Sequence, residues 1–420
     1  IRRPPRSTLD RSSAASDVYK RQTLASALLA NNIHLVGRSF KYHRPRGIMT
    51  AGSEEPNAIV QLHKNTSRTE PNVRATEIEI YEGLEASSQN CWPSVNFDIG
   101  AINNFLNIFF PAGFYYKTFM WPKSFWYKIY EPFIRKAAGF GSASTKHDKE
   151  KYEHKYEYCD LLIAGSGPSG LASAYAAAKN GARVILAEDK PRYGGSLLTS
   201  DVSIGNQSGK DWADNIITEL KGMENVIVKN RSQIFGYYDH NMLVMSERVT
   251  DHLPKSDNYT PKQRMWYIRA KQVVISSGSI ERPIVFGNND TPGVVLASAA
   301  KEYMKVYGVL VGKKPVIFTN NDSAYETAIE FKKNNINPVV LDSRKNPQSE
   351  IIKEALSLGI EVKFSHVVVA AKGYKKVKSC DIAMISDNKE NLIDITNIKC
   401  DCICVSGFWT PTIHLSLIHI

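Results

Sequence analysis

A glycine-rich stretch at residues 163–174, IAGSGPSGLASA, has the residue types and spacing of a nucleotide-binding turn. Its pattern is G-x-G-x-x-G, formed by Gly165, Gly167 and Gly170. In this pattern the first glycine makes a tight turn, the second lets a pyrophosphate approach the backbone, and the third lets the next helix pack on the strand. The amides at the start of that helix bind the phosphates. The stretch therefore predicts a dinucleotide site.

The residues on both sides of this turn have the matching order of elements. The run CDLLIAGSGPSGLASAYAAAKNGARVILAEDK predicts a strand, the turn, a helix and a second strand that ends at Glu188, 18 residues after Gly170. An acid at this place accepts hydrogen bonds from an adenosine ribose and disfavours a 2′-phosphate. The following loop, DKPRYGGSL, offers further amides or a hydroxyl at Gly194, Gly195 and Ser196. The motif favours FAD but does not by itself decide between FAD and NAD.

A weaker copy of the same order occurs at residues 315–344, PVIFTNNDSAYETAIEFKKNNINPVVLDSR. The glycines are replaced by TNNDSA, and side chains there would hinder the approach of a pyrophosphate. We therefore expect two Rossmann-like units, of which the first holds the full nucleotide site. The second is interpreted as a structural repeat or a docking surface.

No catalytic group is recognisable from residue spacing. The CxxC and CxxxxC pairs of disulfide reductases do not occur, and no HExxH or Ser-His-Asp arrangement stands out. His43, His366 and His414 lie near the ends of predicted elements and are interpreted as structural. We therefore assign no catalytic residue and no metal ligand.

Six cysteines among 420 residues form no recognisable disulfide framework, which fits a reducing cytoplasm. Cys400, Cys402 and Cys404 alternate, so all three would point to one face of a strand. In-line thiols without nearby histidines surround a metal poorly, and buried apolar packing is expected instead.

The elements that position the glycine turn follow from the order of strands and helices. Across residues 159–415 predicted strands alternate with helices, which implies a parallel sheet covered on both faces. A small α+β unit at residues 23–99 precedes it. There TLASALLANNI (23–33) has helical periodicity, whereas AIVQLHK (58–64) and RATEIEIYEGL (74–84) alternate like strands.

Between that helix and the first of those strands lies a loop rich in Arg, Gly and Pro, FKYHRPRGIMTAGSEEPN. Two interpretations of its basic residues stay open, a contact with a partner or phosphate and a solvated loop. These residues are Lys41, Arg44 and Arg46, together with Arg38 two residues before the stretch.

An aromatic-rich segment follows, with 13 of the 42 aromatic residues between residues 105 and 133. Lysines and prolines interrupt it too often for a membrane span, which needs about 20 apolar residues. It either packs against neighbouring domains or forms a surface for a partner protein. The charged stretch STKHDKEKYEHKYEY (144–158) is expected to be a solvated linker.

The net charge of +11 does not by itself indicate a nucleic-acid partner. Residues 1–22 hold six Lys/Arg against two Asp, which leaves +7 for the rest of the chain. These residues have the pattern of neither a signal peptide nor a folded element. Residues 1–22 and the tail at residues 416–420 are interpreted as adaptor-derived, so that the natural protein would extend beyond both ends.

Taken together, these stretches resemble the alpha subunits of heterotetrameric sarcosine oxidases. The motifs that carry the resemblance cover most of residues 23–415: GRSFKYHRPRGIMTAGSEEPNAIVQL, YKTFMWPKSFW, CDLLIAGSGPSGLASA, ERPIVFGNNDTPGVVLASAAKEYM, TNNDSAYETA and VSGFWTPTIHL. Alpha-type subunits of opine oxidases and cyanide-forming amine dehydrogenases share this plan and are the nearest alternatives.

The resemblance implies a glutathione-reductase-like α/β fold with two Rossmann-like units, preceded by a ferredoxin-like β-grasp domain. Cluster-bearing relatives have cysteines after HRPRG, where this chain has IMTAGSEEPN, so no iron–sulfur cluster is expected. The expected domains are 23–100 (ferredoxin-like), 101–156 (aromatic connector), 157–300 with 396–415 (first dinucleotide-binding domain) and 301–395 (second Rossmann-like domain).

By resemblance the nucleotide bound to the alpha chain is NAD. The implied contacts are Gly165, Gly167, Ser169, Gly170, Glu188, Asp189, Lys190, Gly195, Ser196 and, near the adenine, Ile234. Ser169 stands where the family usually has alanine, and Phe408 where it commonly has a small residue.

The resemblance also implies assembly with beta, gamma and delta subunits, with FMN at the interface with beta and FAD in beta. The full enzyme would demethylate sarcosine to glycine oxidatively, form peroxide and transfer the one-carbon unit to tetrahydrofolate in a further domain. Neither a nucleic acid nor a membrane is expected as a partner. Two other function classes stay open: a self-sufficient FAD- and NAD(P)H-dependent reductase, and a non-enzymatic assembly scaffold.

Overall fold

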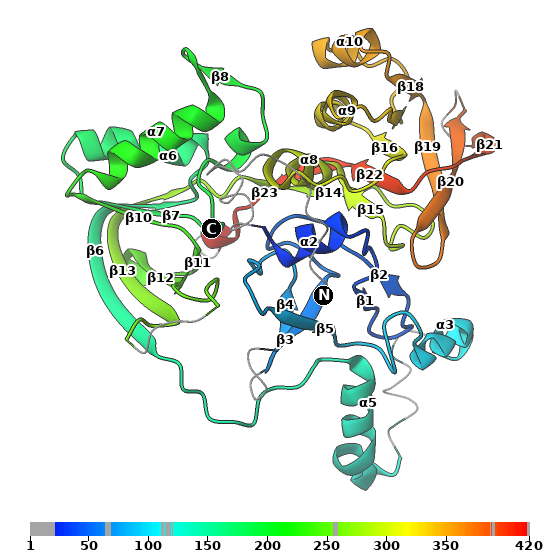
Figure 1. The fold of residues 1–420 in the computed structure, drawn as a ribbon, viewed down its shortest axis with the longest axis horizontal. Helices are drawn as coiled ribbons and strands as arrows, with labels where there is room; N and C mark the ends of the chain where they lie inside the picture. The colour runs from blue at the N-terminus through cyan, green and yellow to red at the C-terminus, as the bar shows by residue number, and fades with distance from the viewer. Residues whose placement is uncertain are drawn as a thin grey trace. The chain divides into compact units, whose positions relative to one another are not determined.

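The computed structural model describes residues 22–63, 69–110, 113, 119, 121–254, 259–386, 388 and 391–417. The chain divides into two compact units, each described here by itself (Figure 1). Unit 1 comprises the residues up to 146 together with 282–408, and unit 2 comprises 147–281 together with the residues from 409 onward. Residues 1–21 and 418–420, which include most of the segments interpreted as adaptor-derived, lie outside the described residues.

Unit 2 is built on a six-stranded sheet with the strand order β10-β7-β6-β13-β12-β11. The strands are β6 (Tyr152–Ala164), β7 (Val184–Ala187), β10 (Val226–Lys229), β11 (Ser232–Tyr238), β12 (Met242–Arg248) and β13 (Gln263–Ile275). The four strands from β10 to β13 along this order pair in parallel, and β12 and β11 continue the sheet in antiparallel. The expected parallel sheet is therefore a mixed sheet in this unit.

Helices α6 (Pro168–Lys179) and α7 (Gly209–Lys221) pack on one face of this sheet (Figure 1). Strand residues alternate between two cores: Val184 and Leu186 pack with the helices, whereas Ile185 packs with Met245 and Trp266 on the other face. Because β7 is buried on both faces, its sequence VILA is apolar throughout.

The second half of the stretch interpreted as a charged linker is instead part of a strand. β6 begins at Tyr152 and pairs with β13 along nearly its whole length, from Tyr152 opposite Gln263 to Ala164 opposite Ile275. Its first residues are mostly exposed, which is why their composition is that of a solvated segment.

Unit 1 contains a five-stranded parallel sheet with the order β15-β22-β16-β17-β18. Its strands are β15 (Val294–Leu296), β16 (Pro315–Thr319), β17 (Val339–Asp342), β18 (Glu361–Phe364) and β22 (Cys402–Ser406), and its helices are α8 (Ala297–Tyr307), α9 (Ser323–Lys333) and α10 (Glu350–Ser357). An antiparallel sheet of β19 (His366–Gly373), β20 (Val377–Ile385) and β21 (Leu392–Ile398) shares a core with it.

The boundaries expected for the two Rossmann-like domains differ from this arrangement. Residues 282–300 and 396–408 were assigned to the first domain, but β15 and β22 belong to the five-stranded sheet of unit 1. The run CICVS of β22 is fully buried and packs between β15 and β16. Its apolar character predicts a buried strand, but nothing in it specifies which of two sheets the strand joins.

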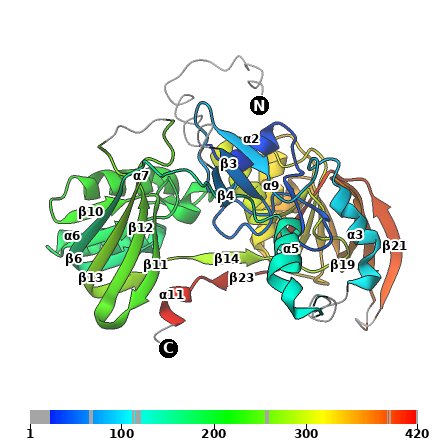
Figure 2. The same cartoon turned by 90° about the horizontal axis from the view of Figure 1, so that it is seen from below.

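The chain passes between the units at β14 (Ser279–Arg282) and at β23 (Phe408–Pro411), which form a two-stranded sheet (Figure 2). The chain returns to unit 2 near its C-terminal end, at residue 409. Short elements complete unit 2: η5 (Gly195–Leu198), β8 (Ser203–Ile204), β9 (Gln207–Ser208), η6 (Asp239–Asn241) and α11 (His414–Leu417).

The N-terminal part of unit 1 contains a helix, a three-stranded sheet and a two-stranded sheet. The elements are α2 (Leu24–Ala30), β1 (Gly37–Arg38), β2 (Pro45–Arg46), β3 (Ile59–His63), β4 (Thr69–Arg74) and β5 (Glu85–Ser88), with the order β4-β3-β5. The expected helix at residues 23–33 begins after Thr23, because the side chains of Thr23 and Ser26 form a capping box. The aromatic segment that follows includes η1 (Ile99–Ala101), α3 (Ile102–Phe105), η2 (Asn107–Phe109), η3 (Lys123–Phe125), the π-helix η4 (Trp126–Tyr130) and α5 (Glu131–Ala138).

The strand expected at residues 74–84 is wrong. β4 ends at Arg74, where that strand was expected to begin, and β5 begins only at Glu85. The alternating residues between them pair with the start of α2 instead: the carbonyl of Ile78 accepts from the amide of Leu24 at 2.7 Å. The alternation of apolar and polar residues in this segment therefore reflects the burial of Ile78, and not a strand of the sheet.

Candidate dinucleotide-binding site

Gly165 and Gly170 occupy places in unit 2 where a side chain does not fit. Gly165 follows β6 directly and turns the chain with a φ of 103°. A Cβ atom on Gly165 would collide with the carbonyl oxygen of Ser276, and a Cβ atom on Gly170 would collide with the carbonyl oxygen of Gly165. The first glycine therefore allows the tight turn and the third allows close helix packing.

Gly167 is different, because the protein itself does not require a glycine there. A Cβ atom on Gly167 would meet no atom within 4 Å, and the residue is only half-buried. Gly167 is the N-cap residue of α6, and no side chain caps that helix. The first amides of a helix have no partner within it, so they are available to a ligand in the open space. This is the cradle that a pyrophosphate would fill.

The loop around Gly194 lies against this turn. The amide of Gly194 donates to the carbonyl oxygen of Ser166 at 3.1 Å, and a Cβ atom on Gly195 would lie 2.9 Å from the Cα atom of Gly167. Gly195 and Ser196 are exposed. The structure therefore brings the two glycine loops together, as their sequences predicted.

Glu188 lies directly after β7 and is 7% exposed. Its carboxylate accepts hydrogen bonds from the amide of Ser166 at 3.0 Å, the hydroxyl of Ser166 at 2.6 Å and the amide of Lys190 at 3.0 Å. Burial raises the pKa of Glu188 to about 7, and the neighbouring Asp189 acts in the same direction. The acid thus anchors the glycine turn, a role that its spacing from Gly170 did not indicate.

The other predicted contacts lie at varying places around this centre. Asp189 and Lys190 are half-buried in the loop after β7, and Ser169 is exposed in the first turn of α6. Ile234 lies in β11 opposite Met245, and its side chain packs against the core of the sheet. The structure therefore brings the glycines, Ser196 and Glu188 together around the turn. Ile234, in contrast, packs against the core of the sheet.

Two serines that follow the parallel strand β13 also border the turn. Ser276 comes directly after β13, and its amide donates to the carbonyl oxygen of Ala164 at 2.8 Å. The hydroxyl of Ser277 donates to the carbonyl oxygen of Thr412 in the returning chain. The residues after neighbouring parallel strands meet at one sheet edge, and this rule would have indicated both serines.

In unit 1 the corresponding turn is filled by side chains. The amide group of Asn321 donates to the hydroxyl of Ser406 at 3.0 Å, and its oxygen accepts from the hydroxyl of Ser323 at 2.6 Å. At the end of β17, the buried Asp342 accepts from the hydroxyl of Tyr325 and from the Arg344 guanidinium, both at 2.8 Å. In unit 1, protein side chains therefore fill the turn that corresponds to the open space at Gly167 in unit 2.

The basic residues of the loop after β1 make internal contacts in unit 1. Arg44 forms a bidentate pair with Asp290 at 2.6 and 2.7 Å, and Arg46 also pairs with Asp290. Arg38 is buried and donates to the carbonyl oxygens of Val95 and His43. These internal contacts do not fit the interpretation of a solvated loop, and the contact with a partner or phosphate stays a prediction.

Cys400, Cys402 and Cys404 are buried as free thiols, but they do not share one face of a strand as expected. Cys402 and Cys404 lie in β22, whereas Cys400 precedes this strand and packs in the core cluster of Ile403 and Val405. In the part of the chain that the structure describes, no group of three or more His, Cys, Asp or Glu residues is arranged to hold a metal ion. Among the described residues, no helix combines the length and the apolar character that crossing a membrane requires.

The fold and the glycine turn define a class of nucleotide-dependent oxidoreductases. Residues 159–414 match the family model described as pyridine nucleotide-disulphide oxidoreductase, and the chain belongs to this family. A crystal structure of L-proline dehydrogenase from P. horikoshii has the same fold, with a TM-score of 0.58, 19% identity, and coverage of 94% of this chain and 58% of that chain.

Within this class the chain is homologous to the alpha subunits of sarcosine oxidases. It is 45% identical to the sarcosine oxidase alpha subunit of Rhizobium meliloti (strain 1021) over 94% of this chain, and 31% identical to that of Corynebacterium sp. (strain U-96) over 94%. It spans only 39% and 37% of the length of these relatives. An opine oxidase subunit of Agrobacterium tumefaciens (strain Ach5) is 26% identical over 39% of this chain and 33% of that protein.

The expectation that the chain has no iron–sulfur cluster is contradicted by a further match. Residues 14–91 match the family model described as 2Fe-2S iron-sulfur cluster binding domain. A cluster of this type is held by thiolates. Among the described residues of this segment, no cysteine precedes Cys91. In the loop after HRPRG, the buried carboxylate of Glu55 accepts hydrogen bonds from the backbone amides of Thr50 at 2.7 Å and Ala58 at 3.0 Å. Cys91 is the one cysteine of residues 14–91, so this segment does not supply four thiolates.

Proposed function

We propose that this chain is the dinucleotide-holding part of an alpha-type subunit of a multi-subunit sarcosine oxidase. Its contribution is to bind an adenine dinucleotide of the NAD or FAD class in unit 2. The full enzyme would demethylate sarcosine to glycine oxidatively, together with beta, gamma and delta subunits in the cytoplasm. A bound dinucleotide would supply hydride or electron-transfer chemistry, and the residues of this chain would bind and orient it.

The observation that carries this proposal is the open space at Gly167. This space lies at the start of α6, which no side chain caps, and next to Gly195. Backbone amides and small residues therefore surround it. We propose that the phosphates bind there, with Gly165, Gly170, Ser169 and Ser196 around them. Glu188, Asp189 and Lys190 would lie toward the ribose.

The assignment to sarcosine rather than an opine rests on the extent of similarity. The sarcosine oxidase relatives align over 94% of this chain, whereas the opine oxidase relative aligns over 39%. Because the alignment with the sarcosine oxidase relatives extends over nearly the whole chain, it favours sarcosine over an opine.

A chimera tests the proposal because this chain spans only part of its relatives. The matching segment of the Rhizobium meliloti alpha subunit is replaced by this chain and expressed with the other subunits of that enzyme. We expect sarcosine-dependent peroxide formation, and its loss when the chain carries Gly167→Ala. An assembled chimera that forms no peroxide with sarcosine, although it is folded and holds a dinucleotide, would contradict the proposal.

A further inference from the structure

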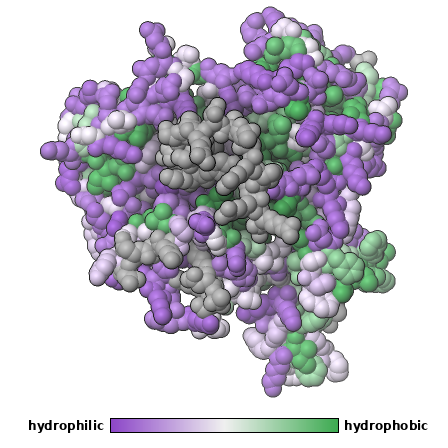
Figure 3. Space-filling model, viewed as in Figure 1, coloured by the Kyte–Doolittle hydropathy of each residue, from purple (hydrophilic) through white to green (hydrophobic). Residues whose placement is uncertain are grey.

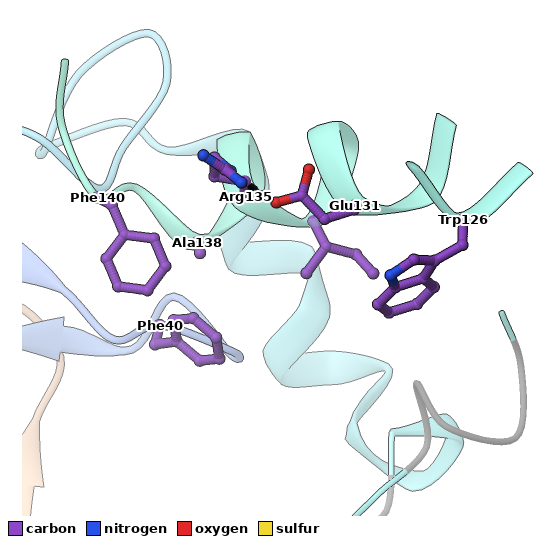
Figure 4. Close-up of a pocket in the computed structure, with 7 residues that line it drawn as sticks. Phe40, Trp126, Glu131, Arg135, Ala138 and Phe140 are labelled. Atoms are coloured by element: carbon purple, nitrogen blue, oxygen red, sulfur yellow. Dashed lines mark hydrogen bonds and ion pairs between the residues drawn. The ribbon is translucent and has the colours of Figure 1, made fainter. Parts of the chain in front are cut away.

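An open apolar groove in unit 1 lies between α5 and the loops on either side of it (Figure 4). Its volume is about 440 Å³. It is lined by Phe40, Trp126, Glu131, Ile134, Arg135, Ala138 and Phe140. Phe40 and Phe140 lie at one end with ring centroids 5.9 Å apart, and Trp126 lies at the other end.

The groove is part of a larger aromatic surface, defined as the exposed large apolar side chains of residues 92–140. Trp121, Tyr127 and Phe133 are 83%, 82% and 71% exposed. Other members are Trp92, Phe97, Ile99, Ile102, Phe105, Leu106, Ile108, Phe109, Phe125, Ile129 and Phe140. Hydrophobic residues gather over α3 and α5 in the space-filling view (Figure 3). Water-facing patches of this kind on proteins mark interaction sites.

The charges on η3, η4 and α5, two of which line the groove, are mainly positive. Lys123, Lys128 and Lys136 of these elements are exposed, and no ion pair is found for them among the described residues. The acid at the groove, Glu131, is already paired with Arg135, with 2.7 Å between Oε1 and Nε. An occupant that completes this surface therefore needs apolar side chains flanked by carboxylates.

We propose that the groove and the aromatic surface bind an acidic surface of another subunit of the enzyme, which places a large apolar side chain between α5 and Phe40. Such anchors at the centre of an interface, in a pocket that excludes water, provide most of the binding energy. The lysines at the rim would mainly raise the rate of association and make it salt-dependent. The choice of partner rests on the proposed function, since the relatives are named as subunits.

Charge argues against a second copy of this chain as the occupant. The whole chain carries +11, and Lys123, Lys128 and Lys136 are exposed on η3, η4 and α5. Two identical copies that met at this surface would bring like charges together, which costs free energy unless counter-ions intervene. An acidic partner gains from the same lysines.

The test measures binding of the full chain to the non-alpha subunits of the Rhizobium meliloti sarcosine oxidase. Ile134→Asp places an unpaired charge in the groove, and Ile134→Leu keeps it apolar. The double variant Lys128→Glu/Lys136→Glu reverses the rim charge. Tyr259→Ser is the matched control, because Tyr259 is an aromatic residue with 87% exposure in unit 2. Circular dichroism and the nucleotide content of each variant show whether it is folded.

We expect Ile134→Asp and the double lysine variant each to weaken binding at least about 10-fold, a loss of about 1.4 kcal/mol. Ile134→Leu and Tyr259→Ser are expected to bind like the wild type. Unchanged binding by folded Ile134→Asp would overturn the proposal. So would a change confined to self-association of the chain, which would make the groove a contact between copies.

The same experiment separates this proposal from the proposed function. A chain that holds a dinucleotide but does not bind the other subunits contradicts the docking site alone. A chain that binds them through the groove but holds no dinucleotide contradicts the nucleotide role alone. If the groove is buried only in a chimera that contains the rest of the alpha chain, then that part of the alpha chain covers the groove. This result would overturn the assignment of another subunit as the partner.

Discussion

The carboxylate of Glu188 accepts two hydrogen bonds from one residue, the amide of Ser166 at 3.0 Å and its hydroxyl at 2.6 Å. Ser166 lies inside the glycine turn, and its carbonyl oxygen accepts the amide of Gly194 from the second glycine loop. A single buried acid therefore links the end of β7 to the turn after β6. This arrangement fixes the glycine turn through contacts within the protein itself.

Glu188→Gln should make the stability of unit 2 less dependent on pH. The folded-state pKa of about 7 lies above the ordinary value of 4.5, so the folded chain keeps a proton between these values that the unfolded chain has lost. The stability that this group contributes is therefore fully present below about pH 4.5 and is lost as the pH rises through about 7.

Urea unfolding of both proteins across this range measures the difference. We expect the wild type to lose stability relative to Glu188→Gln as the pH rises. Parallel stability curves would show that Glu188 is ionised in the folded chain throughout the range.

Gly167→Ala should weaken dinucleotide binding without unfolding the chain. The added methyl group meets no protein atom within 4 Å but occupies the space beside the first amides of α6. Isothermal titration with NAD and with FAD should show at least about a 10-fold loss of affinity, which corresponds to about 1.4 kcal/mol.

Gly222→Ala is the control for this change. Gly222 has a right-handed conformation at the end of α7, and a Cβ atom there meets its nearest neighbour at 3.4 Å. This variant should bind like the wild type. Equal affinities of the two variants would show that no ligand approaches Gly167.

Asp290→Asn should destabilise unit 1 by about 1–3 kcal/mol, the cost of a weakened charged hydrogen bond. Although burial opposes it, the hydrogen bonds from Arg44 and Arg46 hold the pKa of Asp290 below its ordinary value. The neutral amide leaves both guanidinium groups without a counter-charge. Chemical denaturation measures the change, and the exposed Asp214→Asn on α7 should stay within about 0.5 kcal/mol of wild type. Equal losses in both variants would contradict the role of Asp290.

At most one of the six cysteines should react with a thiol reagent in the folded chain. Five are buried and only Cys91 is half-exposed. Burial raises the pKa of Cys91 and raises that of Cys159 to about 12, so few thiolates form at neutral pH. Ellman titration before and after denaturation should give at most one and then six thiols. Fast reaction of several thiols in the native chain would show that the core around β22 opens readily.

The sequence indicated those parts of the fold that depend on local pattern. The strand, glycine turn and helix from Ile163 to Lys179 appear as expected, because only glycine tolerates the conformation and crowding at Gly165 and Gly170. The free, buried thiols near residue 402 also agree with the expected apolar packing. Each of these features is decided within a few residues.

Features that depend on distant residues were predicted less well. The apolar run of β22 does not say that it pairs with β15 and β16. The charges of the loop after β1 do not reveal that Asp290, far along the chain, pairs with Arg44. The absence of cysteines after HRPRG led us to expect a ferredoxin-like domain without a cluster, whereas residues 14–91 match the family described as 2Fe-2S iron-sulfur cluster binding domain. The family of this domain could be predicted from its motifs, but its cofactor was not predicted correctly.

The most direct test of the central claim is to identify what the purified chain holds. The chain is denatured, and the released small molecules are analysed by absorbance and mass, with titration of NAD and FAD into nucleotide-free protein alongside. We predict one adenine dinucleotide per chain, released from the wild type and missing from Gly167→Ala. Neither release nor binding of a dinucleotide by folded wild-type chain would contradict the account.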